Sequence, residues 1–190
     1  MAIVKQVGYR RIEEPRNRMN AQEYMIYLEN GAMENMSTHY ESCGKDWVED
    51  FTASSKLNNS LRNNLAIEYV QSWDFEESKR MGAEKLHALG IETAREMYPD
   101  HQFIVVPQVS DKGNYHNHIL FCAVSESGKR ISSTFDERKR FTKITDRKVK
   151  ELGLSIPERN KKAKEKLPRA GHDMLKRGRT DRKSTRLNSS

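Results

Sequence analysis

The pattern of apolar and polar positions is clearest in the middle of the chain. A continuous apolar run extends from Ile119 to Val124, and the segment from His101 to Val109 is also strand-like. The residues between these two segments, Ser110 to Asn114, are of the types that form turns. The pattern therefore predicts a β-hairpin over residues 102–124.

Strands and helices alternate along the rest of the chain. Asn20 and Glu23 have the spacing of a capping box at the start of a helix, and Gly31 is a typical helix stop. The other predicted elements are a strand over residues 2–9, helices over 21–29 and 46–57, a strand over 65–73, and helices over 76–97 and 145–152. This order predicts an α/β fold: a central, mostly antiparallel sheet with helices packed on it, on one face.

The composition is that of a globular domain. A chain of 190 residues and 22.1 kDa is long enough to bury a substantial core. It contains no run of about 18 apolar residues, and its N-terminus lacks the apolar stretch of a signal peptide. Two cysteines, Cys43 and Cys122, cannot form a disulfide framework. We therefore expect a cytoplasmic protein with no membrane contact.

Positive charge is concentrated late in the chain. Residues 1–136 hold 15 Lys and Arg against 20 Asp and Glu, whereas residues 137–180 hold 16 against 6. The basic residues that we expect to contact a nucleic-acid backbone are Arg138, Lys139, Arg140 and Lys143. The alternative is a solvated face or an arm without fixed structure, because charge runs are common in both.

The end of the chain has a different character. From Pro157 to about residue 180 the sequence is Lys-rich without apolar periodicity, which predicts a basic arm. The last ten residues, 181–190, match the in-frame translation of a common DNA-sequencing adapter. We predict that they are an artefact and that the natural protein continues beyond Thr180.

Two histidines begin the second strand of the predicted hairpin. His116 and His118 are two positions apart, so both side chains should project from one face of the strand. Two imidazoles side by side on a rigid strand are typical of a metal site. The alternative is one metal-free histidine beside a solvent-facing one.

The order of motifs resembles the relaxase/mobilization nuclease family of plasmids and integrative elements. The motifs that carry the resemblance are Val70–Trp73, His87–Gly90, Tyr98–Gln102, Asp111–Gly113, His116–His118, Phe141–Asp146 and Gly153–Ser155. The resemblance covers about residues 1–156, which would form a relaxase-like nuclease domain, with residues 157–180 starting a truncated C-terminal region. It implies the His-hydrophobe-His endonuclease fold.

The resemblance also implies a reaction and its partners. A DNA relaxase nicks one strand at a transfer origin by tyrosine attack on the phosphodiester, which initiates conjugative transfer or mobilization. The family's tyrosine aligns with Tyr27; Tyr24 is the second choice and Tyr40 the third. A divalent metal, Mg²⁺ or Mn²⁺, held by His116 and His118 would stabilise charge on the phosphate. The expected partners are single-stranded DNA at the transfer origin and accessory relaxosome proteins.

One metal position departs from the family pattern. The family's third metal histidine stands two residues before the turn Asp, where this chain has Val109. We expect the Val109 side chain to face the histidine pair and Gln108 to face away, unless a bulge at Pro107 turns it. Asp111 and Gln108 are the candidate supporting residues. The alternative function is a catalytically weakened relaxase-like domain that binds transfer-origin DNA without efficient nicking.

Overall fold

The fold is described from a computed structural model, which covers residues 3–10, 19–59, 64–132, 134–154 and 156. The chain divides into two compact units, Met1–Pro157 and Glu158–Ser190. The first unit contains all the helices and strands described below. The predicted basic arm and the predicted adapter segment lie outside the described residues.

A five-stranded antiparallel sheet forms the centre of the first unit. Its strands are β1 (Ile3–Arg10), β2 (His39–Glu41), β3 (Ala66–Trp73), β4 (Phe103–Val109) and β5 (Tyr115–Cys122). Their spatial order is β1-β3-β5-β4-β2, so β5 is the central strand. The predicted α/β fold and the predicted hairpin of β4 and β5 are confirmed.

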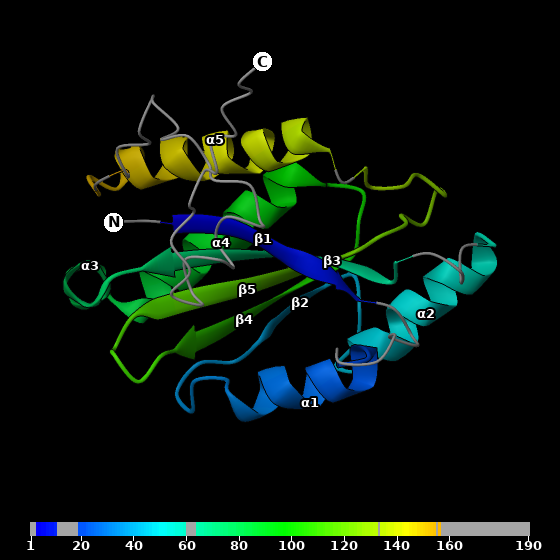
Figure 1. The fold of residues 1–190 in the computed structure, drawn as a ribbon, viewed down its shortest axis with the longest axis horizontal. Helices are drawn as coiled ribbons and strands as arrows, with labels where there is room; N and C mark the ends of the chain where they lie inside the picture. The colour runs from blue at the N-terminus through cyan, green and yellow to red at the C-terminus, as the bar shows by residue number, and fades with distance from the viewer. Residues whose placement is uncertain (1–2, 11–18, 60–63, 133, 155, 157–190) are drawn as a thin grey trace, which may run out of the picture. The chain divides into compact units, whose positions relative to one another are not determined.

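Helices cover both faces of this sheet, and the expectation of helices on one face was wrong (Figure 1). The helices are α1 (Ala21–Asn30), α2 (Trp47–Leu57), α3 (Phe75–Met81), α4 (Ala83–Met97) and α5 (Phe135–Glu151). Helices α1 and α2 pack on one face, and α4 and α5 pack on the other. The reason is that neighbouring residues of β5, such as Ile119 and Leu120, are both fully buried, so this strand is apolar on both sides.

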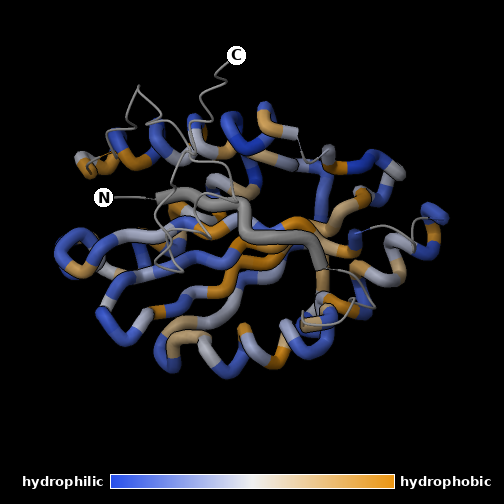
Figure 2. Tube along the Cα trace, viewed as in Figure 1, coloured by the Kyte–Doolittle hydropathy of each residue, from blue (hydrophilic) through white to orange (hydrophobic). Residues whose placement is uncertain are grey.

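Two layers of apolar side chains result from this arrangement. The layer beneath α1 and α2 includes Tyr24, Leu28, Phe51, Val106 and Leu120. The layer beneath α4 and α5 includes Tyr69, Met97, Ile119, Phe121 and Phe141. Figure 2 shows the same distribution, with orange in the middle of the sheet and mostly blue in the connecting turns. No helix in the described ranges combines the length and hydrophobicity needed to cross a bilayer.

The ends of several elements follow from local capping. At the start of α1, the Asn20 side chain accepts a hydrogen bond from the Glu23 N–H, and the Glu23 side chain accepts one from the Asn20 N–H. The predicted helix over 76–97 is two helices, because Gly82 adopts φ = 81° and ends α3 before α4 begins. Thr134 caps α5, which therefore starts ten residues before the predicted helix over 145–152.

Candidate functional site

The two histidines lie on the central strand, on the face covered by α1 and α2. In an antiparallel pair, directly opposed residues share a face. His118 is opposed by Val106, a member of the apolar layer beneath α1, and His116 is opposed by Gln108. The two imidazole ring centroids are 6.4 Å apart, and both side chains are partly exposed.

A buried carboxylate orients the second histidine. Glu68 on β3 is fully buried, and its Oε1 lies 2.8 Å from His118 Nδ1. Because a carboxylate only accepts hydrogen bonds, His118 Nδ1 must be the donor. In the neutral imidazole, Nε2 then carries the free lone pair. This is the arrangement by which a carboxylate prepares a histidine to bind a metal.

The same carboxylate connects the histidine to α1. The hydroxyl of Tyr24, which is buried, donates a hydrogen bond to Glu68 Oε1. The ring of Tyr27 stacks on the ring of Tyr24, with centroids 5.6 Å apart and an interplanar angle of 22°. Tyr27 itself is 48% exposed. A continuous chain of contacts therefore links an accessible phenol to His118.

The third candidate tyrosine, Tyr40, lies on a different element from Tyr24 and Tyr27. Tyr40 lies on the edge strand β2, opposite Ile104, and packs against the same apolar layer as Tyr24. Burial, followed by the negative charge of Glu29, raises the pKa of the Tyr40 hydroxyl. A higher pKa reduces the fraction of phenolate at Tyr40.

The strand register corrects the expectation for Val109 and Gln108. Val109 pairs with Tyr115, whose side chain is buried beneath α4, so Val109 faces away from the histidines and is 45% exposed. Gln108 pairs with His116 and shares its face. The strand has no bulge at Pro107; β4 and β5 pair in continuous register from Phe103 to Val109. Gln108, which we expected to face away, is thus the β4 side chain beside His116.

Gln108 is held in place by the end of α1. Its Nε2 donates a hydrogen bond to the Leu28 carbonyl at 3.2 Å, and its backbone forms a β-bridge with Ala32. Gly31 packs so closely against Gln108 that a Cβ there would lie 2.7 Å from Nε2. This hydrogen bond uses the amide nitrogen of Gln108 and leaves the role of Oε1 as an acceptor open to other groups.

These groups include the nitrogen and oxygen donor types of a divalent-metal site. With metal–nitrogen bonds of about 2.1 Å, the centroids of two ligating imidazoles are roughly 4.6 Å apart for adjacent ligands and roughly 6.5 Å apart for opposite ligands, so from the observed 6.4 Å the rings must approach each other to bind one ion as adjacent ligands. Over the described ranges, no cluster of three or more His, Cys, Asp or Glu side chains could hold an ion. Water and Gln108 Oε1 would therefore complete a coordination shell begun by His116 and His118.

Comparison with known proteins decides the family. Residues 24–154 match the family model described as "Relaxase: MobA/VirD2-like, nuclease domain". The chain belongs to this relaxase family. Its curated relatives include proteins named "Protein rlx" from Staphylococcus aureus. One is 27% identical over 146 residues, covering 76% of this chain and 43% of that protein. Another is 39% identical over 77 residues, covering 40% and 24%. The chain thus spans less than half the length of the curated relatives it matches.

Asn117, the residue between the two histidines, anchors the central strand of the relaxase domain to α4, on the face of the sheet opposite the histidines. Asn117 is fully buried; its Oδ1 accepts from the Tyr115 hydroxyl at 2.9 Å, and its Nδ2 donates to the Leu86 carbonyl at 2.7 Å. It packs against Gly90 of α4, where any Cβ would overlap the amide. This clamp fixes β5 against α4 and so fixes the positions of both imidazoles.

Glu68 is the site residue that sequence reasoning missed. Its signal was present, because Glu68 is an acidic residue inside the apolar strand over 65–73. A buried charge is expensive unless it is paired and hydrogen-bonded, so an acidic residue at such a position indicates a polar partner on the same face. The sequence alone does not show that the partners are His118 and Tyr24, because these come from β5 and α1.

We expect Glu68→Ala to weaken metal binding and the fold together. Without the carboxylate, the donors of Tyr24 and His118 lose their buried partner, which should lower the free energy of unfolding by roughly 1–3 kcal/mol. Loss of imidazole orientation should reduce Mn²⁺ affinity roughly 10- to 100-fold, measured by calorimetry on the folded protein. Glu68→Gln keeps one acceptor oxygen, so its free energy of unfolding and its Mn²⁺ affinity should both fall less than those of Glu68→Ala. Native Mn²⁺ affinity in Glu68→Ala would reject the orienting role.

The other predicted residues lie apart from this site. Asp111 is exposed in the β4–β5 turn. His101 is buried, with Nδ1 2.9 Å from the Cys122 carbonyl, and burial lowers its pKa, which fits a structural role. Burial also raises the pKa of Cys122 to about 11 and that of Cys43 to about 12, so neither thiol is activated. The basic cluster beginning at Arg138 lies on α5, across the sheet from the histidines.

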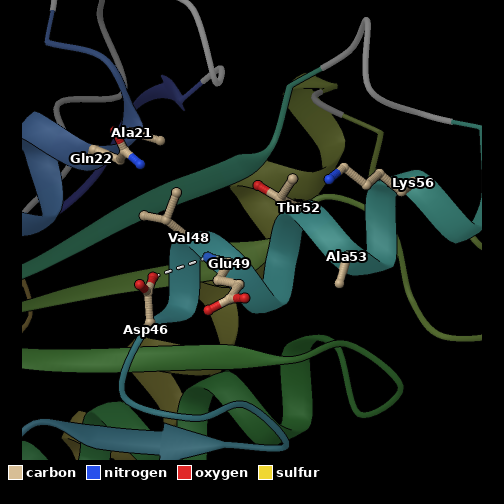
Figure 3. Close-up of a pocket in the computed structure, with 8 residues that line it drawn as sticks. All are labelled: Ala21, Gln22, Asp46, Val48, Glu49, Thr52, Ala53 and Lys56. Carbon is tan, nitrogen blue, oxygen red and sulfur yellow. Dashed lines mark hydrogen bonds between the residues drawn. The ribbon is translucent and has the colours of Figure 1, made fainter.

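A pocket between α1 and α2 is also separate from the histidine site (Figure 3). It is lined by Ala21 and Gln22 at the start of α1, and by Asp46, Val48, Glu49, Thr52, Ala53 and Lys56. The Asp46 carboxylate accepts the Glu49 N–H at 3.0 Å and so caps α2. None of His116, His118, Glu68 and Gln108 lines this pocket, and we assign no chemistry to it.

Proposed function

We propose that this domain nicks one strand of DNA at a transfer origin, with Tyr27 as the nucleophile and His116 and His118 as the ligands of a divalent metal. The reaction would initiate conjugative transfer or mobilization of the element that carries the gene. Membership of the relaxase family supports DNA as the substrate. The contacts from Tyr27 through Tyr24 and Glu68 to His118 support the choice of residues.

The accessibility of Tyr27 is the observation that carries the assignment. A nucleophile that attacks a DNA phosphate must be exposed, yet close to the groups that stabilise the transition state. Tyr27 is 48% exposed, whereas Tyr24 one turn earlier is 5% exposed and uses its hydroxyl on Glu68. The stacked Tyr24 ring also limits how far the Tyr27 ring can move, which favours a defined position for its phenol.

The chemical step exchanges one phosphodiester for another. The Tyr27 oxygen forms a bond to phosphorus as the bond from phosphorus to the leaving nucleotide oxygen breaks. The phenol loses a proton and the leaving oxygen gains one. Because the new bond is also a phosphoester, the energy of the DNA bond is retained, and the strand can later be rejoined by the reverse reaction.

The metal would be held by the residues already described. His118, oriented by Glu68, and His116 would supply nitrogen ligands, and Gln108 Oε1 an oxygen ligand. Such an ion supplies electrostatic stabilisation of the negative charge that develops on the phosphate. Among the two expected ions, imidazole ligands favour Mn²⁺ over Mg²⁺, whose preferred ligands are oxygens.

The absence of a third histidine supports a second candidate function. Within the described part of the chain, the histidine face offers two imidazoles and one amide in place of three imidazoles. A weakened metal site would leave a domain that binds transfer-origin DNA, recruits accessory proteins and nicks inefficiently.

Supercoiled plasmid carrying the cognate transfer origin distinguishes the two functions. An active relaxase converts supercoiled DNA to open circles in Mn²⁺, which an agarose gel resolves after protein digestion. We expect conversion in Mn²⁺ and none in EDTA. Retarded plasmid mobility without any conversion, at protein concentrations that saturate binding, would instead establish the binding-only function.

A further inference from the structure

The exposed side of α5 combines cations with an aromatic ring. Its buried side consists of Phe141, Ile144, Thr145 and Val149, which pack toward the sheet. On the other side, Phe135 is 62% exposed, with the Lys139 Nζ 4.3 Å and the Arg138 Cζ 5.7 Å from its ring centroid. Lys143 is exposed one turn further along the helix.

Among the residues that the structure describes, some cations of α5 form ion pairs and others do not. Arg147 pairs with Glu96, Lys148 pairs with Glu92 and Glu96, and Arg140 lies 3.8 Å from Glu137. These pairs connect the second half of α5 to α4 or lie within α5. Arg138, Lys139 and Lys143 form no ion pair with any residue of the described ranges. Their charge is therefore available to an external anion.

The histidine face does not offer comparable charge on its helices. Helix α1 contains Glu23 and Glu29 and neither Lys nor Arg, and α2 contains Glu49 and Asp50 with Lys56. A metal ion would neutralise the phosphate at the nick, but the flanking phosphates also need cations, because affinity for DNA rests mainly on backbone charge. Helix α5, which carries the cations that form no ion pair within the described residues, lies on the opposite face of the sheet (Figure 1).

We propose that Phe135, Arg138, Lys139 and Lys143 form a second DNA-binding surface, which holds single-stranded DNA away from the nick site. The exposed Phe135 ring would stack on an unpaired base, while the three cations contact phosphates on either side. Stacking on an aromatic ring requires an unpaired base, so the aromatic residue favours single-stranded over duplex DNA. The inference rests on the proposed function only in identifying this strand as the one that is nicked.

The test measures binding of labelled oligo-dT of about 40 nucleotides by fluorescence anisotropy, with the full chain in EDTA to remove metal from the histidine site. Lys139→Gln/Lys143→Gln should lower affinity roughly tenfold near 0.1 M salt and reduce the salt slope by roughly 1.4, since each single-strand phosphate contact contributes about 0.7. Lys56→Gln/Lys85→Gln removes the same charge from exposed sites on other helices and is the matched control. Phe135→Leu should weaken binding roughly 5- to 100-fold.

The outcomes separate this surface from the nicking reaction. Unchanged affinity in the α5 variants, or an equal loss in the Lys56/Lys85 control, would overturn the proposal, because binding would then not depend on this surface. Phe135→Leu with native affinity would overturn the stacking role. The adduct that Tyr27 forms on a cognate oligonucleotide is measured separately, in the native protein. Failure of that adduct in the native protein would reject the proposed function while leaving the oligo-dT result interpretable.

Discussion

Replacing both His116 and His118 with alanine is expected to abolish binding of Mn²⁺ by this domain. The two imidazoles are the only nitrogen ligands that the strand register places together on the β5 face beneath α1 within the described residues. Both histidines are partly exposed and β5 is clamped by Asn117, so the double variant should still fold. Calorimetric titration of the folded variant measures the effect. Native Mn²⁺ affinity in the double variant would show that the metal binds elsewhere.

A histidine added on the correct side of β4 should strengthen the same site. Gln108→His places a third imidazole opposite His116, so it should tighten Mn²⁺ binding, whereas Val109→His points toward the other face and should not. The two variants differ by one position on the same strand, which makes each the control for the other. Tighter binding in Val109→His alone would mean that β4 adopts another register in solution.

Replacing Tyr27 with phenylalanine should eliminate the covalent protein–DNA adduct. The substitution removes only the hydroxyl of a side chain that is 48% exposed, so fold and DNA affinity should remain nearly native. The adduct survives denaturant and is measured as a shifted band on a denaturing gel after incubation with a single-stranded oligonucleotide that spans the nick site. At least a thousandfold loss of adduct is expected when the nucleophile itself is removed, by analogy with other covalent catalysts (roughly 10⁶-fold in the best-studied case).

Tyr24→Phe is the matched control for this prediction. It also removes one hydroxyl from α1, but it keeps the ring that stacks on Tyr27. We expect the adduct to form, at a reduced rate, because the hydrogen bond that connects α1 to Glu68 is lost. Loss of the adduct in Tyr24→Phe with its retention in Tyr27→Phe would exchange the roles of the two residues.

The parts of the account that depend on local sequence could be predicted. The hairpin follows from two apolar runs around a turn, and the helix that carries Tyr27 follows from the Asn20–Glu23 capping box. The common face of His116 and His118 follows from their spacing on a strand. Each of these features is determined by residues within a few positions of one another.

The features that depend on how distant strands align could not be predicted. The β4 residue that faces the histidines is set by the pairing register of β4 and β5, which depends on the turn between them. A register shift of one residue would place Val109 on the histidine face and Gln108 on the opposite face. Glu68 was visible as an interruption of an apolar strand, but its partners lie 44 and 50 residues away in the sequence. The early start of α5 was missed because the five residues after Phe135, 136–140, are all charged and show no apolar periodicity.

The most direct test of the central claim is to identify the residue that becomes attached to DNA. The full chain is incubated in Mn²⁺ with single-stranded oligonucleotides that tile the transfer origin of its own element, then digested with protease and nuclease, and the modified peptide is sequenced by mass spectrometry. We predict a nucleotide attached to Tyr27 through its phenolic oxygen. A nucleotide attached to Tyr24, Tyr40 or any other residue, or no modified peptide from an oligonucleotide that is cleaved, would contradict the account.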